Sequence, residues 1–449
     1  MANRFSPFSA PLSPSPSFLS AAARIDVSRR SVLGGALGLG ALAALTACGS
    51  SGSTAEGSGA ITVGSNQSDA VPKAAYANII DAFKKSSGTE ATINTVDHNT
   101  FQEQINSYLQ GDPDDVFTWF SGYRMKFFAD QGLAGDISSV WDNFGDSFNQ
   151  SFKDAATAGD GKQYFVPLSY YPWAVFYRKS VFEEKGYSIP TTLDEYIALA
   201  QGMQQDGLAP IGFADKGGWE AMGTFDVLNM RINGYDFHTS LLAGEKSWES
   251  NEVKEVFQTW KTLLPYHQEG ALGREWQEAA QGLLQKTTGT YLLGMFVSQQ
   301  FQDAEGGEAL EDLDFFTFPE INPDYGTDSL DAPIDGFMMS AKTKNAGTAK
   351  ELLEFLGTPE AQKINTDSDK GLVAPVNGAD TSGYTALQQK GMELVSSAKH
   401  IAQFMDRDTR PDFASTVMIP SLQAFIKDPD NLDNVLSDIE TQKKTIFVD

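Results

Sequence analysis

Carboxylates are the most abundant groups in this sequence that could do chemistry. The 449 residues contain 59 Asp and Glu, four His and a single Cys. A glycoside hydrolase needs two carboxylates across the bond that it cleaves. At this acid content, pairs such as Asp114-Asp115 and Glu183-Glu184 are expected by chance. No nucleophile elbow, HExxH motif, phosphate-binding loop or dinucleotide-binding glycine pattern occurs. The residues therefore do not predict an enzyme.

Metal chemistry has equally little support in the sequence. The single cysteine excludes an internal disulfide and a Cys-rich metal site. The four histidines lie far apart along the chain. Tyr170-Tyr171 superficially offers the tyrosine pair of an iron site, but adjacent residues of a strand point in opposite directions and cannot bind one metal together. We predict no metal and no cofactor.

Charge and composition restrict the partners. The formal net charge is −26, which repels phosphate backbones, so we predict no nucleic-acid partner. Hydrophobic residues make up 41%, and 7 Trp, 14 Tyr and 30 Phe are enough for large cores. A chain of this length predicts two or three domains.

The elements that would position a site alternate between strand and helix patterns. Residues 61–63, 91–96 and 115–119 read as strands. One helix is expected from Pro72 to Gly88, and a second begins at a capping box, Thr100-x-x-Glu103. This alternation predicts an α/β fold with mostly parallel sheets and helices on both faces.

Ligands of such sheets bind outside the carboxyl ends of the strands. The loops that follow the three predicted strands are residues 66–69, 97–99 and 119–123. They are the first places where we expect a site.

Later segments continue the pattern. A helix begins at a second capping box, Thr192-x-x-Glu195, and residues 245–287 are rich in helix patterns. Residues 290–296 and 336–340 read as strands, and a last helix closes at Gly357.

The N-terminus reads as an export signal. Arg29-Arg30 precede 17 uncharged residues, and this arrangement resembles a twin-arginine signal. Leu45-Thr46-Ala47-Cys48 resembles a bacterial lipobox, which implies lipid on the Cys48 thiol. We predict a signal peptide over residues 1–47 and a lipidated cysteine with a flexible tether over 48–60. Removal of 1–47 takes away four Arg and one Asp, a net charge of +3, and leaves −29.

Four stretches of the remaining chain resemble the extracellular solute-binding proteins of sugar ABC importers, the class that includes the maltodextrin binders. Arg178 departs from the family pattern because Asn is common at its position. The matching stretches are Pro113–Phe117, Val166-Pro167 with Val175–Phe182, Gly336–Ser340 with Lys344-Asn345, and Thr358–Gln362 with Gly371–Pro375.

The resemblance implies a two-lobed fold of the periplasmic-binding-protein type, hinged by several crossovers. We expect one lobe at 61–167 plus 320–375 and the other at 168–319 plus 376–449. It also implies a monomer at the outer face of the cytoplasmic membrane, anchored by Cys48. Its partners would be a small carbohydrate and the permease subunits of an ABC importer.

Sugars present apolar ring faces and polar edges, so a sugar site needs flat aromatic rings and planar polar side chains. We expect Trp119 and Trp219 to stack on the ligand from opposite sides of the cleft. Acidic residues are scarce in the loops considered, which favours a neutral di- or oligosaccharide. The candidate binding residues are Asn66, Gln67, Asp69, His98, Trp119, Tyr171, Trp173, Trp219, Phe296, Asp335 and Arg407.

Two alternatives remain open at this point. The protein could bind another solute, such as iron, a peptide or a polyol, or it could be a secreted glycoside hydrolase. Turnover of oligosaccharides would distinguish the hydrolase, and an iron-induced absorption band would distinguish the iron binder.

Overall fold

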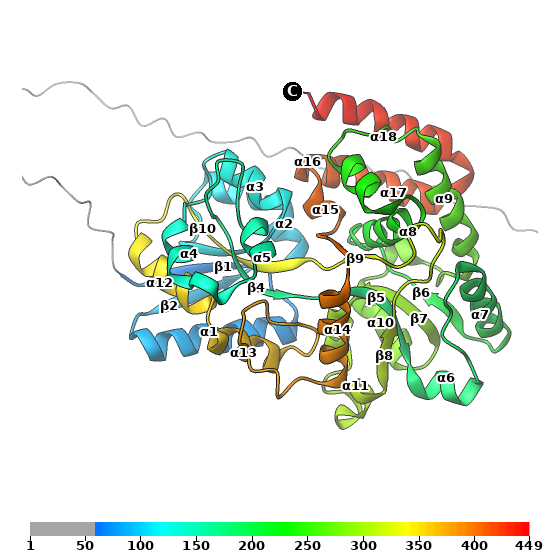
Figure 1. Cartoon of the computed structure of the whole chain (residues 1–449), viewed down its shortest axis with the longest axis horizontal. Helices are drawn as coiled ribbons and strands as arrows, with labels where there is room; N and C mark the ends of the chain where they lie inside the picture. Colours follow the sequence, from blue (N-terminus) through cyan, green and yellow to red (C-terminus); the bar gives the residue numbers. More distant parts are fainter. Residues whose placement is uncertain (1–58, 449) are drawn as a thin grey trace, which may run out of the picture. The chain divides into compact units, whose positions relative to one another are not determined.

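The computed structural model describes residues 59–448 (Figure 1). The predicted signal peptide, the lipobox with Cys48 and nearly all of the tether lie outside the described residues. Within the described part, no helix has the length and apolar character needed to cross a membrane.

The first sheet has five strands in the order β2-β1-β3-β10-β4. The first strand pairs in parallel with its two neighbours, whereas β10 runs antiparallel between β3 and β4. The strands are β1 (Ile61–Ser65), β2 (Ala91–Thr95), β3 (Val116–Phe120), β4 (Val166–Tyr170) and β10 (Ile334–Met339).

Helices α1 (Ala70–Ser87) and α2 (His98–Gln110) follow the first two strands, as predicted. Gly88 ends α1 in the left-handed conformation, with φ 73°. The predicted capping box at Thr100 is wrong. Asp97 is the N-cap instead, because its carboxylate accepts the backbone N–H of Thr100 at 3.0 Å.

The second sheet has four strands in the order β6-β7-β5-β8. The capping box predicted at Thr192 is present and starts α7 (Leu193–Gln205). Arg178, the departure noted above, is buried and pairs with Asp312 at 2.6 Å and Glu305 at 3.0 Å. The strands are β5 (Trp173–Arg178), β6 (Ala209–Gly212), β7 (Thr288–Gly294) and β8 (Leu313–Phe316).

The sheets are mixed, which corrects the expectation of mostly parallel sheets. In the second sheet, β5 is antiparallel to both of its neighbours, and only β6 and β7 are parallel. The reason lies in the connections. β5 follows β4 directly, without a helix between them, and β10 joins the first sheet late in the chain. Neither β5 nor β10 therefore belongs to a strand–helix–strand unit, which would make neighbouring strands parallel.

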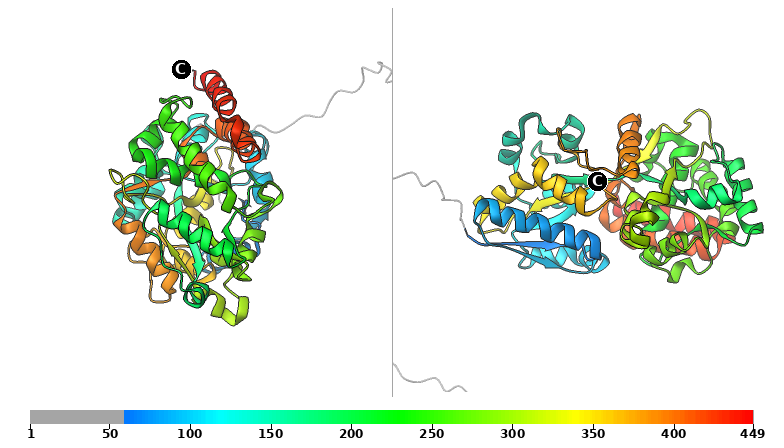
Figure 2. Two further views of the ribbon diagram at one scale, coloured as in Figure 1. Left: turned by 90° about the vertical axis from the view of Figure 1, so that its right-hand side faces the viewer. Right: turned by 90° about the horizontal axis from the view of Figure 1, so that it is seen from below.

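The chain passes between the two sheets at several points. Tyr170 ends β4 in the first sheet and Trp173 begins β5 in the second, with two residues between them. The return from β8 to β10 runs through β9 (Ser329–Asp331), which pairs in parallel with β11 (His400–Ala402). The view from below separates the blue and cyan segments of the first sheet from the green segments of the second (Figure 2).

Helices cover the sheets on both sides, so the α/β class is confirmed. Those near the first sheet also include α3 (Tyr123–Asp130), α4 (Ser138–Phe144), α5 (Gln150–Ala155), α12 (Ala346–Leu356) and α13 (Pro359–Ser368). The others are α6 (Lys179–Lys185), α8 (Glu220–Leu242), α9 (Asn251–Leu263), α10 (Trp276–Leu284), α11 (Glu308–Asp312), α14 (Ala386–Ser397), α15 (Met405–Asp408), α16 (Pro411–Phe413), α17 (Ile419–Lys427) and α18 (Leu432–Ile446).

Candidate functional site

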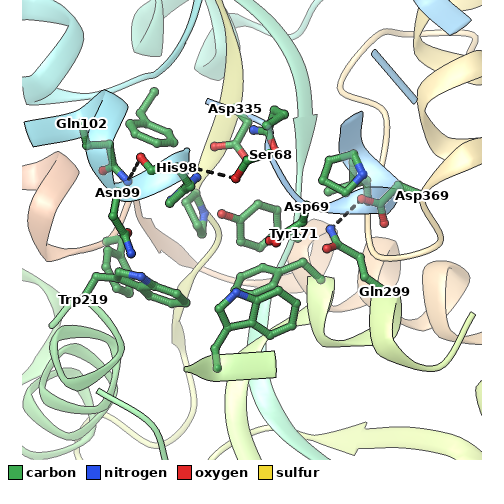
Figure 3. A pocket seen from close by; sticks show the side chains of 18 of the residues that line it. Ser68, Asp69, His98, Asn99, Gln102, Tyr171, Trp219, Gln299, Asp335 and Asp369 are labelled. Carbon is green, nitrogen blue, oxygen red and sulfur yellow. Dashed lines mark hydrogen bonds between the residues drawn. The ribbon is translucent and has the colours of Figure 1, made fainter. Parts of the chain in front are cut away.

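A cavity of about 470 Å³ is lined by residues from both sheet regions and from the crossovers (Figure 3). Its size lies within the range of small-molecule sites in proteins. The first sheet supplies side chains from the ends of its strands, where a ligand of an α/β sheet is expected. The second supplies mainly aromatic rings.

The wall from the first sheet is mostly polar. Gln67 and Asp69 follow β1, His98 begins α2, and Phe120 ends β3. Asp335 lies on β10 and faces the same space. This wall therefore combines amide, carboxylate and imidazole groups with one phenyl ring.

The wall from the second sheet region is mostly aromatic. Trp173 begins β5, Trp219 precedes α8, Trp276 begins α10, and Phe296 follows β7. The Trp173 and Trp219 rings are perpendicular with centroids 6.4 Å apart, and Trp219 lies 6.0 Å from Phe296. These rings give the cavity flat apolar surfaces.

Two glycines allow Trp219 to take its position. Gly218 has φ 80°, a conformation that other residues rarely adopt. A Cβ on Gly217 would lie 2.8 Å from Nε1 of Trp219, so only glycine lets the indole fold back against this turn. The Gly-Gly-Trp sequence is thus a structural requirement for the aromatic wall.

Arg407 joins the wall from the first sheet to Tyr171, in the crossover between β4 and β5. Its Nη1 donates to Asp335 at 2.9 Å, and its Nη2 donates to the Tyr171 hydroxyl at 3.2 Å. The guanidinium carbon lies 4.1 Å from the centre of the Phe120 ring, a cation–π distance. Burial raises the pKa of Asp335, and the charge and hydrogen bond of Arg407 oppose that rise.

Acidic groups are abundant around the cavity, which corrects the expectation that they are scarce. Arg407 is the only Lys or Arg among the described residues that line it. Burial raises the pKa of Asp369 to about 6, against hydrogen bonds from Gly371 and Gln299. The cavity therefore disfavours binding of an anionic ligand. Its acidic residues are Asp69, Asp97, Glu275, Glu278, Asp335, Asp369 and Asp406.

His98 is neutral in this environment. Burial and the nearby positive charge of Arg407 lower its pKa to about 4, and a hydrogen bond with the backbone of Asn66 opposes the change. A neutral imidazole both donates and accepts hydrogen bonds, as a ligand hydroxyl does.

Two hydrogen bonds join the walls across the cavity. Nε2 of Gln277, on α10, donates to Asp69 at 3.0 Å. Nε2 of Gln299, after β7, donates to Asp369 at 2.8 Å. Burial raises the pKa of Asp69, and the bond from Gln277 opposes this rise. These bonds hold the two sheet regions together around the space.

Nine of the eleven predicted binding residues line the cavity. They are Gln67, Asp69, His98, Tyr171, Trp173, Trp219, Phe296, Asp335 and Arg407. Their part in binding remains a prediction, but the structure brings them together from segments that are distant in sequence.

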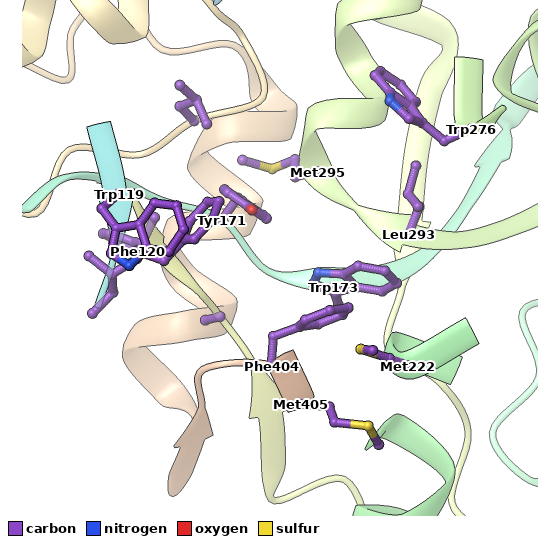
Figure 4. Close-up of a cluster of buried hydrophobic side chains, with 14 of the residues drawn as sticks. Trp119, Phe120, Tyr171, Trp173, Met222, Trp276, Leu293, Met295, Phe404 and Met405 are labelled. Carbon is purple, nitrogen blue, oxygen red and sulfur yellow. The ribbon is translucent and has the colours of Figure 1, made fainter. Parts of the chain in front are cut away.

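Trp119 and Asn66 do not line the cavity, and these two expectations are wrong. Trp119 is 1% exposed and packs against Phe120 and Phe128, with centroids at 5.1 and 5.5 Å (Figure 4). Phe120 is the last residue of β3 and reaches the cavity, whereas Trp119, one residue earlier, lies in the core. The Asn66 side chain accepts a hydrogen bond from the hydroxyl of Thr118, at 2.9 Å, beneath the cavity.

Several lining residues escaped the sequence analysis. Phe120 lies in the predicted loop 119–123, which was a usable signal. Asp369 precedes the Gly371–Pro375 stretch that carried the family resemblance, which was a usable signal. No local pattern marks Trp276, Gln277 or Phe404, because only tertiary packing brings them to the cavity.

One other group of side chains could hold a metal by composition. Asp226, His238 and Asp331 each offer an atom within 4.8 Å of the others, and all three are buried. None of them lines the cavity. Asn229 lies 3.1 Å from Nδ1 of His238 and directs the ring hydrogen to Nε2, where a metal would need a lone pair.

The sequence profile of the bacterial extracellular solute-binding proteins matches residues 66–363. This chain belongs to that family. An ABC transporter extracellular-binding protein of Pyrococcus horikoshii is 24% identical over 344 residues, which cover 75% of this chain and 72% of the relative. The alpha-glucosides-binding periplasmic protein AglE of Rhizobium meliloti is 26% identical over 323 residues, 66% and 68% of the two chains.

Solved structures give the same assignment. The bacterial solute receptor AcbH, described as having an exclusive preference for β-D-galactopyranose, superposes with a TM-score of 0.84. It is 47% identical, and the match covers 87% of this chain and all of that one. The raffinose-bound protein RafE has a TM-score of 0.70 at 16% identity over 87% of this chain and 100% of its own, which supports the fold alone.

The predicted family and two-lobed fold are thus confirmed. The comparisons favour the sugar-importer class over the iron, peptide and hydrolase alternatives. The family consists of extracellular solute-binding proteins that act in transport.

Proposed function

We propose that this protein captures a neutral sugar with a galactopyranose ring, either free or at the end of a di- or oligosaccharide, and delivers it to an ABC import permease. The observation that carries the proposal is the cavity itself. It pairs an aromatic wall, with Trp173, Trp219 and Phe296, with a polar wall, with Asp69, His98 and Asp335. Ring faces and hydroxyl edges need these two kinds of surface.

The choice of sugar rests on similarity and charge. AcbH, at 47% identity, is described as a β-D-galactopyranose receptor. The seven acidic lining residues disfavour sugar acids and sugar phosphates. They suit hydroxyl donors, because carboxylates accept hydrogen bonds.

Calorimetric titration would test the ligand class. We expect D-galactose to bind and D-galacturonate to show no binding, with D-glucose, maltose and D-mannitol as further arms. A ligand that binds only the folded state also raises the melting temperature, so thermal shift is an independent readout. Binding of mannitol, a peptide or ferric iron without any neutral sugar would refute the proposal.

The membrane anchor forms a second part of the proposal. We infer lipidation at Cys48 and export by the twin-arginine route through Arg29 and Arg30. Cys48→Ala should release the protein from membranes with unchanged sugar affinity. Lysine at both arginine positions should block export. Retention of the first variant in membranes, or normal export of the second, would contradict the corresponding inference.

The lobes are proposed to move as units, one with residues 61–167 plus 320–375 and the other with 168–319 plus 376–449, in a monomeric protein. Hinge closure around a ligand is a known mode of domain motion. Small-angle scattering should give a smaller radius of gyration with saturating galactose than without it, at a mass of one chain. An unchanged radius with bound sugar would contradict lobe closure.

A further inference from the structure

Three titratable side chains meet in the interior beside the crossover strand β9. Asp226 and His238 come from α8, and Asp331 ends β9. Each is 0% exposed. Within residues 59–448, Oδ1 of Asp226, Nε2 of His238 and both carboxylate oxygens of Asp331 have no hydrogen-bond partner. So many buried polar atoms without a partner indicate that a proton, an ion or a water molecule lies between them.

A metal ion is excluded by the position of the histidine proton. Nδ2 of Asn233 donates to Oδ1 of Asn229 at 2.9 Å and to the backbone oxygen of Glu252 at 3.1 Å. This orients the amide of Asn229 so that its NH₂ group faces Nδ1 of His238 at 3.1 Å. An amide NH₂ only donates, so Nδ1 accepts and the neutral ring carries its hydrogen on Nε2. A protonated Nε2 has no lone pair for a metal.

The same histidine cannot serve as a counter-ion. Burial lowers the pKa of His238 to about 3, so the ring is neutral at physiological pH. Its Nε2–H group lies 3.9 Å from Oδ1 of Asp226 and faces the carboxylates as a neutral donor.

In the described part of the chain, no cation forms an ion pair with either aspartate, although the charges of Arg231 and Arg407 lower the pKa of Asp331. Arg231 on α8 uses Nε and Nη1 for the backbone oxygens of Phe318 at 3.0 Å and Ser329 at 2.7 Å. Among the residues that the structure places, no Lys or Arg nitrogen comes within 4.0 Å of either carboxylate. The other charged groups that act on the pair are Asp406, Arg407 and Asp408 on α15, and Asp328, preceding β9, acts on Arg231.

Two carboxylates in one buried site cannot both be ionised. Burial raises the pKa of each well above its usual range. The negative charge of Asp331 also raises the pKa of Asp226. The charge of Asp408 raises the pKa of Asp331, and the positive charges of Arg231 and Arg407 oppose that rise. One proton between Oδ1 of Asp226 and a carboxylate oxygen of Asp331 would give both atoms a hydrogen-bond partner and remove one of the two negative charges.

The pair is connected to the cavity through two segments. Asp331 is followed by Pro333 and Asp335, which line the cavity. Oδ2 of Asp226 accepts the backbone N–H of Met405 at 2.6 Å, between the lining residues Phe404 and Arg407. Phe404 has φ 106°, which a non-glycine residue adopts only when its surroundings hold it there.

We propose that Asp226 and Asp331 share one proton at neutral pH, and that this proton fastens the cavity-lining segments 331–335 and 404–407 to helix α8. Loss of the proton leaves two negative charges within 4.8 Å of one another and separates the segments. Stability declines as the pH rises above the usual pKa of an aspartate, and sugar affinity declines at the higher pH at which the folded pair loses its proton. The site is a proton-binding site outside the sugar cavity, and its test does not depend on the identity of the sugar.

The decisive variant is Asp331→Asn, whose amide can donate to Asp226 without a titrating proton. In the wild type, the folded pair holds one proton that the unfolded chain releases above about pH 5. The unfolding constant should therefore rise about tenfold per pH unit more steeply in the wild type than in the variant, from pH 5 to 7. Denaturant titrations at each pH measure this difference.

Asp236→Asn is the matched control, because Asp236 is an exposed carboxylate on the same helix. It should keep the wild-type slope. If Asp331→Asn does not fold, Asp226→Asn replaces it, because its amide donates in the opposite direction. Equal slopes in the wild type and the folded variant would overturn the proposal.

A metal arm completes the test. Addition of EDTA or of Zn²⁺ should leave the melting temperature of the wild type unchanged. A loss of stability with EDTA in the wild type and not in Asp331→Asn, together with stoichiometric metal in the purified protein, would replace the shared proton by a metal ion and refute the proposal.

Discussion

Two tryptophans in this protein were both predicted to contact the ligand, but only one of them lines the cavity. Trp119 is the last residue of the strand predicted at 115–119, and Trp219 follows a glycine pair before a helix. The first is 1% exposed in the core. The second lines the cavity, perpendicular to Trp173. The type of residue and its nearness to a strand end were therefore poor guides to its role.

Backbone geometry explains the difference. Trp119 and Phe120 are the last two residues of β3, their ring centroids are 5.1 Å apart, and Arg124 of α3 lies over both rings. Phe120, at the end of the strand, reaches the cavity, whereas Trp119 packs against Phe101 of α2 and Phe128 of α3. The place of Trp219 is set instead by the turn at Gly217 and Gly218.

The largest expected effect follows from the core position of Trp119. Trp119→Ala should cost about 3–5 kcal/mol of folding free energy, as truncation of a buried large aromatic usually does. The folded fraction should still bind galactose, because the ring does not touch the cavity. Calorimetric melts and a titration below the melting temperature measure the two effects. A variant with the wild-type melting temperature and lost sugar affinity would reverse the comparison.

The second prediction concerns acid stability at the polar wall. His98 has a pKa of about 4 in the folded protein, below the usual 6.5. Between pH 6.5 and 4, the unfolded chain binds a proton that the folded protein does not, so stability falls as the pH decreases. One such group lowers the free energy of unfolding at pH 5 by up to about 2 kcal/mol relative to neutral pH.

His98→Gln should flatten this acid decline, and denaturant titrations from pH 7 to 4.5 would show it. His238 and His267 are also kept neutral by burial and remain in the variant, so part of the slope should persist. An unchanged slope would mean that His98 takes up its proton in the folded protein.

The third prediction tests the aromatic wall. Trp219→Ala should weaken galactose binding at least tenfold, about 1.4 kcal/mol, because a stacked ring is lost. Stability should change little, since this ring is only partly buried. Trp219→Phe keeps an aromatic surface and should recover most of the affinity. Unchanged affinity with a large drop in melting temperature would make Trp219 a core residue like Trp119.

The sequence predicted the parts of this protein that depend on local patterns. The helix that ends at Gly88, the capping box at Thr192 and the family stretch around Val166-Pro167 all depend on neighbours within a few residues. The antiparallel insertion of β10 between β3 and β4 could not be predicted in this way, because it is a pairing between distant segments.

The site shows the same division. Gln67 and Asp69 were found because they follow a strand directly. The acidic character of the cavity was missed because its carboxylates come from separate segments, such as Glu275, Asp369 and Asp406. Each looks like a surface residue in its own stretch. Only the packing of the crossovers brings them together.

The smallest effect is expected where the two walls meet. The hydrogen bond from Gln277 to Asp69 joins α10 to the loop after β1, and the bond is partly buried. A single bond of this kind contributes about 0.5–1.5 kcal/mol. If closing of the walls accompanies binding, loss of this bond acts on affinity rather than on the folding of either sheet.

Gln277→Ala should therefore raise the dissociation constant for galactose by about fivefold, the equivalent of roughly 1 kcal/mol. Gln281→Ala is the matched control, because Gln281 lies on the same helix and bonds to Gln300, on the same side of the cavity, at 3.1 Å. It should bind galactose like the wild type. Equal affinities for all three proteins would show that the walls are held together by packing of the crossovers, whereas equal losses in both variants would point to a general effect on α10.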